Sequence, residues 1–396
     1  MLNGQLKTDI LKSLALLLME NSAEIIAANL MDLSNCPPDD SVIFDRLYMD
    51  ETRVEKMVDS VRKIIELPDP VGKLLFSETR ADNLRIENRA VPFGTVLIIY
   101  EARPNVTVEA AVIALKAGNR VLLKGGKEAR NTNLFLANLW QRALEENNVD
   151  KNFIRYLDLT REETQRLICG ETEKFDLVIP RGGTSLIDFV LKNSKAPVLV
   201  SGRGNNFLFI DREADFEMAV RIALDGKRRL SVGNALDKIL IDESLPDFEM
   251  KTAQLVEIFL ERNIEVFGNE TVRRLNDSVQ PIANEEIWRE EFLSAKILIA
   301  MVKNASEAIE KINRFSGAHS AAIVTHNNDT AEKFLNQVDC AAVYHNASVR
   351  FTDGGEFGLG AEIAVSTQKL HFRGPLGAEH LLTNKWFVRG EGQIRQ

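Results

Sequence analysis

The sequence of 396 residues predicts an α/β protein whose main layers are doubly wound parallel sheets. Three observations carry this prediction. Residues 95–100 and 121–123 are short apolar runs, and each is followed by a polar loop and then a helical pattern. Residues 175–180 repeat the same layout of strand, Gly-Gly loop and helix. Strands that alternate with helices in this way form parallel sheets with helices on both faces.

The amino-terminal part of the chain predicts helices and then a hairpin. Residues 5–34 and 51–66 carry apolar residues at helical spacing, and Asp50 is a suitable cap for the second segment. In residues 78–92, the turn signal Asp82-Asn83 is followed by spaced apolar residues. We expect a β-hairpin there, either exposed to solvent or paired with another surface. An exposed two-stranded ribbon is marginal alone, which favours pairing.

The loops that follow the first two predicted strands carry the chemistry of this region. Pro104 ends the first strand pattern, and a helix follows at 108–116. At the second junction Lys124 and Lys127 flank Gly125-Gly126 directly before a helix. Parallel sheets bind ligands at the carboxyl ends of their strands, and a helix N-terminus beside lysines favours an anionic group such as a nucleotide phosphate. The alternative is a tight turn without a ligand.

The remaining elements continue the alternation of strands and helices. We expect further strands at 153–157, 196–200, 207–210, 264–268, 297–302 and 387–394. We expect further helices at 132–146, 160–168, 248–262 and 305–315. The helix at 160–168 begins with Thr160 and Glu163, the spacing of a capping box.

Composition excludes several classes of protein. A formal net charge of −9 argues against nucleic acid as the main partner. The apolar run at 14–19 is far too short to span a bilayer, so we expect no membrane association. The three cysteines are odd in number and widely spaced, which indicates free thiols in a reducing cytoplasm. The five histidines have no metal-ligand spacing, and we expect no metal.

Several segments resemble one family. IYEARPNVT, KAGNRVLLKGG, KEARNTN, IPRGG and nearly all of residues 339–395 are similar to γ-glutamyl phosphate reductases, also called glutamate-5-semialdehyde dehydrogenases, of the aldehyde dehydrogenase superfamily. The resemblance implies the aldehyde dehydrogenase-like fold with three parts. Residues 1–226 would be the cofactor domain with an oligomerisation hairpin near 78–92, and 227–356 the catalytic domain. Residues 357–396 would return to the cofactor domain and end in a strand that pairs with a neighbouring subunit.

The resemblance also implies a reaction, which is the NADPH-dependent reduction of L-glutamyl 5-phosphate to glutamate 5-semialdehyde and phosphate in proline biosynthesis. It implies a cytoplasmic homo-oligomer, with association with glutamate 5-kinase as a further expectation. Cofactor-binding positions would be Lys124, Gly125, Gly126, Arg181, Gly182, Gly183 and Glu291. Substrate-binding positions would be Arg103, Asn346 and Arg350, the last because its guanidinium matches the substrate α-carboxylate bidentately.

The family's catalytic segment contains a departure. Residues 231–235 read Ser-Val-Gly-Asn-Ala, and Gly233 stands where the family has its nucleophilic cysteine. Reduction of an acyl phosphate by this route needs a thiolate that expels phosphate and forms a thioester. Asn105 matches the superfamily position whose amide helps to form the oxyanion hole, with the backbone N–H of Gly233 as the second donor. This part of the site does not need the thiol.

Two interpretations of Gly233 remain open. The chain is either an otherwise ordinary reductase altered at one position or a non-catalytic relative that binds NADPH or partners the upstream kinase. The nearly intact set of other motifs favours the first interpretation. The family has a His-bearing loop and a second His where this chain has Ser201 and Phe207. This difference favours the interpretation as a non-catalytic relative. The region also lacks the general-base Glu of aldehyde oxidisers, which suits a reductase that must not hydrolyse its intermediate.

Overall fold

The computed structural model describes residues 2–36 and 41–395, and the chain divides into two compact units. The first unit comprises Met1–Ser201, Gly358–Ala364 and Leu376–Gln396, and the second comprises Gly202–Phe357 and Val365–Pro375. The boundary predicted at 226/227 is therefore corrected to 201/202. The reason is that β7 (Asn206–Ile210) pairs within the sheet of the second unit, and α9 (Phe216–Gly226) packs on that sheet.

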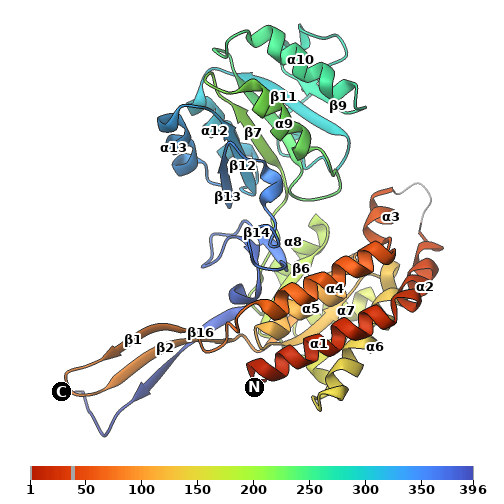
Figure 1. Ribbon diagram of the computed structural model, residues 1–396, viewed down its shortest axis with the longest axis vertical. Coiled ribbons are helices and arrows are strands. Elements are labelled where there is room, and N and C mark those ends of the chain that lie inside the picture. The colour runs from red at the N-terminus through yellow and green to blue at the C-terminus, as the bar shows by residue number, and fades with distance from the viewer. Residues whose placement is uncertain (1, 37–40, 396) are drawn as a thin grey trace. The chain divides into compact units, whose positions relative to one another are not determined.

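The first unit is built on a parallel four-stranded sheet with the order β5-β4-β3-β6, as described for residues 2–36 and 41–395. Its strands are β3 (Thr95–Tyr100), β4 (Arg120–Lys124), β5 (Ile154–Tyr156) and β6 (Leu177–Arg181). One face carries the main core, which is shared with α1 (Gly4–Glu20), α2 (Ser22–Leu33), α4 (Glu51–Glu66), α5 (Val106–Lys116) and α6 (Arg130–Glu146) (Figure 1). The opposite face is covered by α7 (Arg161–Ile168) and α8 (Thr184–Asn193), while α3 spans Ser41–Leu47.

Local capping confirms two of the predicted helix starts. The Asp50 carboxylate accepts the backbone N–H of Arg53 at 2.8 Å at the start of α4. Thr160 and Glu163 form the predicted capping box of α7. These side chains satisfy backbone donors that have no partner inside the helix. No single helix in the described part of the chain is long and apolar enough to cross a membrane. The helices α1 and α2 reach that length and composition only together, and the pair is bent by 70°.

The predicted strand at 196–200 is wrong in extent. In that segment only Val198 forms a bridge, to Val178 of β6. The bridge includes bonds from the Val178 N–H to the Pro197 oxygen and from the Leu199 N–H to the Val178 oxygen, and Pro197 itself has no N–H to donate.

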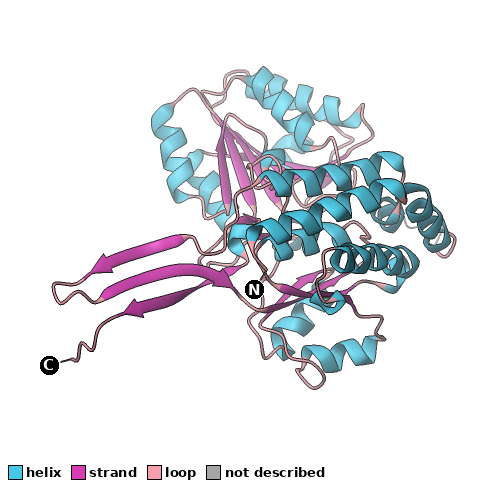
Figure 2. Ribbon diagram, turned by 60° about the horizontal axis from the view of Figure 1, so that its bottom comes forward, coloured by secondary structure: helices cyan, strands magenta, loops and turns pink. Residues whose placement is uncertain are grey.

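An arm of three antiparallel strands projects from the first unit, with β1 (Leu74–Thr79), β2 (Arg85–Pro92) and β16 (Leu382–Arg389) side by side (Figure 2). The hairpin predicted at 78–92 is confirmed, but the terminal strand begins five residues earlier than predicted and pairs with β2 of the same chain. The Glu87 carboxylate on the central strand draws Arg85, Arg89 and Arg389 together, which fixes this register.

The second unit is built on a parallel seven-stranded sheet with the order β10-β9-β11-β8-β7-β12-β13 among the described residues. Besides β7, its strands are β8 (Leu236–Asp242), β9 (Glu265–Gly268), β10 (Gln280–Pro281), β11 (Lys296–Val302), β12 (Ser320–Val324) and β13 (Ala342–His345). One face packs against α9 and α10 (Phe248–Leu260), and the other against α12 (Ala305–Phe315) and α13 (Asn328–Gln337) (Figure 1). The doubly wound α/β prediction is thus confirmed for both units.

Short elements complete the chain. Among the described residues they are α11 (Glu270–Arg273), the strands β14 (Ala364–Ser366) and β15 (Gly374–Leu376), which pair with each other, and the 3₁₀ turns Lys127–Ala129, Lys151–Phe153, Glu285–Trp288, Val349–Phe351 and Ala378–His380. None of the three cysteines forms a disulfide bond, and Cys340 is buried in the core. Burial raises the pKa of the Cys340 thiol to about 11, which makes it a poor nucleophile at neutral pH.

Candidate functional site

The candidate active site of the second unit lies at the amino ends of three adjacent strands. Gly233 precedes β8, Gly204 precedes β7, and His319 precedes β12, and β7 lies between the other two strands. These residues are far apart in the sequence and become neighbours because the three strands are parallel and in register. The sheet order, rather than any local motif, assembles this site.

The backbone of Gly233 is held in one position from two sides. A side-chain carbon on Gly204 would overlap the Gly233 carbonyl, so the two backbones approach each other more closely than any other residue would permit. Asn206, which is fully buried, donates from Nδ2 to the carbonyl oxygens of Gly233 at 2.8 Å and Ala235 at 2.6 Å. The point from which a side chain at position 233 would project is therefore fixed by the fold.

The direction that a side chain would take from Gly233 is open. A Cβ at this position would lie 3.9 Å from Glu291 Oε1 and 3.9 Å from His319 Nε2, both ordinary van der Waals distances. Glu291 Oε1 accepts the backbone N–H of Gly204 at 3.0 Å. The structure thus brings the predicted positions Gly233 and Glu291 together, and it adds His319 as a third group at the same point.

His319 is buried, with 2% of its surface exposed, and burial lowers the pKa of its imidazole to about 4. The ring is therefore neutral at physiological pH. Its Nδ1 lies 3.2 Å from the Ser320 hydroxyl, which donates to Asn206 Oδ1 at 2.6 Å. A continuous buried network joins the imidazole to the side chain that holds the Gly233 backbone.

The segment that presents Glu291 is clamped from β8. The ammonium of Lys238 donates to the Glu290 carbonyl at 2.8 Å and lies 3.7 Å from the centre of the Phe292 ring. Asp237 accepts the Phe292 N–H at 3.1 Å and pairs with the buried ammonium of Lys227 at 3.0 Å. Burial lowers the pKa of Lys238 to about 7. These contacts fix Glu291 through its neighbours on both sides.

Arg350 and Asn346, the predicted substrate-binding residues of the second unit, have different contacts. Arg350 is half-buried, and its guanidinium contacts Asn234 Oδ1, one residue beyond Gly233. Asn234 in turn donates to the carbonyls of Arg350 at 3.0 Å and Thr352 at 3.1 Å. Asn346 has a left-handed backbone, with φ of 55°, and its amide pairs with both backbone groups of Thr325. The Asn346 amide therefore joins β13 to β12.

The glycine pairs of the first unit pack against the chain's own side chains. A Cβ on Gly182 would lie 2.6 Å from the Glu101 carboxyl carbon, and one on Gly126 would lie 2.5 Å from Glu128 Oε2. Gly125 has no room because the Asn133 amide lies against it. Glu101 Oε2 accepts the Gly183 N–H at 2.8 Å, so an internal carboxylate lies at the N-terminus of α8.

The predicted cofactor contacts fit the first unit in part. Lys124 and Arg181 are partly buried cations at the ends of β4 and β6, and such groups can pair with the phosphates of a dinucleotide. Burial lowers the pKa of both, against the raising effect of nearby carboxylates. The phosphate role predicted for the glycine pairs has less support, because the chain's own carboxylates already occupy the space beside them.

Arg103 and Asn105 lie in the loop between β3 and α5, and both are partly buried. The Asn105 amide donates to Glu109 Oε2 at 2.8 Å, one helical turn later. An amide nitrogen carries two hydrogens, and this bond uses one of them. The role of Asn105 as an oxyanion donor stays a prediction.

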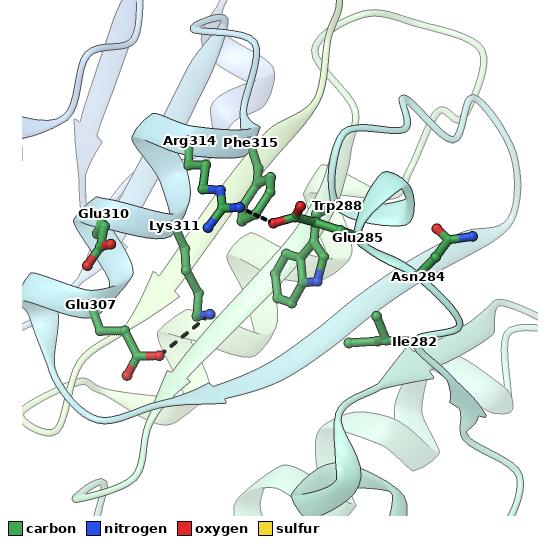
Figure 3. A pocket seen from close by; sticks show the side chains of 9 residues that line it. All are labelled: Ile282, Asn284, Glu285, Trp288, Glu307, Glu310, Lys311, Arg314 and Phe315. Carbon is green, nitrogen blue, oxygen red and sulfur yellow. Dashed lines mark ion pairs between the residues drawn. The ribbon is translucent and has the colours of Figure 1, made fainter.

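A separate cavity of about 320 Å³ lies in the second unit and is shown in Figure 3. Trp288 and Phe315 stack against each other with ring centres 5.7 Å apart, and Asn205 Nδ2 donates to the carbonyls of both. The two cations drawn there are paired with acids, Lys311 with Glu307 and Arg314 with Glu285 (Figure 3). The predicted site residues are not among those that line this cavity.

The sequence patterns did not indicate Asn206, Ser320 and Lys238, which organise the candidate site of the second unit, or Glu101, which lies beside Gly182 and Gly183 in the first unit. One signal was present: Asn206 is a polar residue at the start of an otherwise apolar strand. A buried polar residue must find hydrogen bonds, but only the fold shows with which partners. Within residues 2–36 and 41–395 there is no cluster of three or more His, Cys, Asp or Glu side chains that could hold a metal ion.

Comparison with known proteins agrees with the fold. Residues 3–256 and 279–360 match the model of the aldehyde dehydrogenase family. The γ-glutamyl phosphate reductase of Clostridium botulinum (strain Eklund 17B / Type B) is 42% identical over 392 residues, covering 98% of this chain and 94% of that protein. The one from Dictyoglomus thermophilum is 40% identical over 400 residues, covering 100% and 95%.

A solved structure is also similar over the whole chain. The crystal structure of γ-glutamyl phosphate reductase from Thermotoga maritima superposes with a TM-score of 0.92 at 39% identity, covering 100% of this chain and 95% of that one. An acetylating aldehyde dehydrogenase from Geobacillus thermoglucosidasius shares the fold, with a TM-score of 0.73 at 16% identity. The chain belongs to the γ-glutamyl phosphate reductases, within the aldehyde dehydrogenase family.

Proposed function

We propose that this chain has the binding apparatus of an NADPH-dependent reductase that converts L-glutamyl 5-phosphate to glutamate 5-semialdehyde and phosphate in proline biosynthesis. We further propose that its turnover is severely impaired because residue 233 is glycine. The observation that carries the proposal is the open direction at Gly233, which faces Glu291 and His319 from a backbone fixed by Asn206. The relatives at about 40% identity over the whole chain support the choice of reaction.

The residues of the second unit have defined parts in this proposal. Arg350 binds the α-carboxylate of the substrate, and Asn234 orients its guanidinium. Glu291, held by Gly204, accepts hydrogen bonds from ribose hydroxyls of the cofactor. NADPH, when bound, supplies the hydride that reduces the acyl group. Losing the nucleophile of a covalent mechanism lowers turnover by a factor on the order of 10⁶.

The same proposal includes a cytoplasmic homo-oligomer, with the arm as the oligomerisation element. The arm presents large apolar side chains to solvent, among them Phe76, Trp386 and Val388, which are about half exposed. Exposed apolar surface of this kind favours contact with another protein surface. Association with glutamate 5-kinase is a further proposal, which co-purification of the two proteins would test.

The test restores the missing thiol. The reverse reaction, with glutamate semialdehyde and NADP⁺ in phosphate buffer, is measured for the unsubstituted chain and for Gly233→Cys. Gly233→Ala serves as the matched control that fills the position without a nucleophile. We expect Gly233→Cys to exceed both others by at least roughly 10³-fold, a fraction of the full effect of a covalent nucleophile.

One outcome would contradict this proposal. If Gly233→Cys is as silent as the unsubstituted chain while both still bind NADPH, the site lacks more than a thiol. The changes at Ser201 and Phe207 would then matter. The chain would be better described as a non-catalytic protein that binds NADPH or partners the upstream kinase.

A further inference from the structure

The hydrogen bonds around His319 determine which of its ring nitrogens carries the proton. The Ser320 hydroxyl donates its single hydrogen to Asn206 Oδ1 at 2.6 Å, because the Asn206 Nδ2 end is committed to the carbonyls of Gly233 and Ala235. Ser320 Oγ can then only accept from the imidazole, 3.2 Å away. His319 Nδ1 therefore carries the hydrogen in the neutral ring, and Nε2 is left with its lone pair.

The unprotonated nitrogen points at residue 233. The Nε2 atom lies 3.9 Å from the position of a Cβ on Gly233, and a sulfur atom on that carbon can come within hydrogen-bonding distance of it. No hydrogen bond to Nε2 is formed by the described residues. The ring is buried and its pKa is lowered to about 4, so the base form is the resting form at neutral pH.

We propose that His319 is the general base of this site and takes the proton of a cysteine thiol at position 233. This chain keeps the base although it lacks the thiol. The proposal rests on the proposed function for its choice of nucleophile. Ser320 and Asn206 are positioning residues, because they act through the imidazole and the Gly233 backbone.

With a cysteine at residue 233, the step balances without any further reactant. The thiol proton moves to His319 Nε2 as sulfur attacks the carbonyl carbon of the acyl phosphate. The C–S bond forms, the bond between that carbon and the phosphate oxygen breaks, and phosphate leaves with the electron pair. A thioester remains, and no atom is oxidised or reduced. Burial disfavours an isolated imidazolium, but a thiolate beside the ring stabilises it.

Glu291 is the competing base, since its Oε1 lies at the same distance from the Cβ position of residue 233. That oxygen already accepts the Gly204 N–H at 3.0 Å, so one of its acceptor positions is occupied. Its negative charge also opposes a thiolate at residue 233 and favours an imidazolium at residue 319. The geometry therefore favours His319 as the acceptor and leaves Glu291 as a group that helps the ring to hold the proton.

The experiment measures, as a function of pH, the rate at which iodoacetamide alkylates the thiol that Gly233→Cys introduces. Mass spectrometry follows the peptide that contains residue 233, and buried Cys340 is an internal reference of low reactivity. The same rates are measured after a second substitution, His319→Asn, His319→Gln, Ser320→Ala or Glu291→Gln. An Asn side chain keeps a hydrogen-bond donor near the Nδ1 position but has no basic nitrogen. His319→Asn therefore distinguishes a role of His319 as a base from a purely structural role. Neither substrate nor cofactor is needed.

We expect Gly233→Cys to react at pH 7 roughly ten-fold or more faster than the double variants with Asn or Gln at residue 319. The rates of those double variants should rise only through an ordinary thiol pKa of about 8.5. Ser320→Ala should lower the rate at pH 7 by a smaller factor, because the ring can then place its hydrogen on Nε2.

Two results would overturn the proposal. The first is an unchanged pH profile in the His319→Asn double variant, and the second is loss of the enhanced rate with Glu291→Gln instead of with the substitutions at His319. Because alkylation needs no turnover, the base can be demonstrated even if Gly233→Cys fails to act on the proposed substrate. Likewise, Gly233→Cys can be active on that substrate even if His319 proves not to be the base.

Discussion

Gly204 and Gly233 lie against each other in the second unit, but they are glycines for different reasons. Any side chain on Gly204 would overlap the Gly233 carbonyl, whereas a Cβ on Gly233 would meet nothing closer than 3.9 Å. The first glycine is required by a close approach of two backbones, and the second is not required by packing at all. The fold therefore permits a side chain at residue 233, in the direction of His319 and Glu291.

The glycines of the first unit fall between these extremes. A Cβ on Gly182 would meet Glu101 and Leu186, and a Cβ on Gly126 would meet Glu128; these obstacles are side chains and can move. These glycines thus differ in what an added Cβ would meet. It would meet rigid backbone at Gly204, movable side chains at Gly182 and open space at Gly233. A glycine in a candidate active site says little until its neighbours are known.

The largest expected effect tests the two ends of this ranking. Gly204→Ala should lower the free energy of unfolding by about 3 kcal/mol or more, because neither backbone can yield without losing the hydrogen bonds of Asn206. Gly233→Ala should leave stability unchanged or raise it by up to about 1 kcal/mol, since it restricts the unfolded chain without a clash. Urea unfolding of both variants checks this. Equal losses would show that position 233 is as closed as position 204.

An intermediate effect is expected for the buried imidazole that faces the open position. His319 has a pKa of about 4 in the folded chain, against about 6.5 when unfolded, so the unfolded state binds more protons between those values. Stability should therefore fall as pH falls through this window, by roughly 2 kcal/mol at pH 5 relative to pH 7. His319→Asn should remove this part of the acid sensitivity. An identical pH dependence in that variant would mean that the imidazole is solvated.

The smallest effect concerns the movable group at Gly182. Gly182→Ala should cost about 1 kcal/mol, the lower end of overpacking, because the Glu101 carboxylate can shift aside at the expense of its bond to the Gly183 N–H. In a Glu101→Ala background the same substitution should cost less than half as much. A double-mutant cycle measured by urea unfolding gives the coupling, and additive effects would place the obstruction elsewhere.

Much of this protein follows from the sequence alone. The strand at 95–100 and the helices at 51–66 and 305–315 match the structure residue for residue, and the α/β alternation follows with them. Apolar spacing, capping residues and strand-breaking prolines are local properties, and local properties can be read along the chain. The family resemblance was visible for the same reason, and so was the glycine at position 233.

The site itself was decided by tertiary structure. The strand order β8-β7-β12 places Gly233, Asn206 and His319 together, although they are up to 113 residues apart in sequence. The terminal strand β16 pairs with β2, about 300 residues earlier, and only this pairing brings Arg389 to Glu87. The proton on His319 is located only by a chain of hydrogen bonds through Ser320. Long-range register and hydrogen-bond direction leave no periodic trace in a sequence, because they depend on which strands become neighbours when the sheet closes.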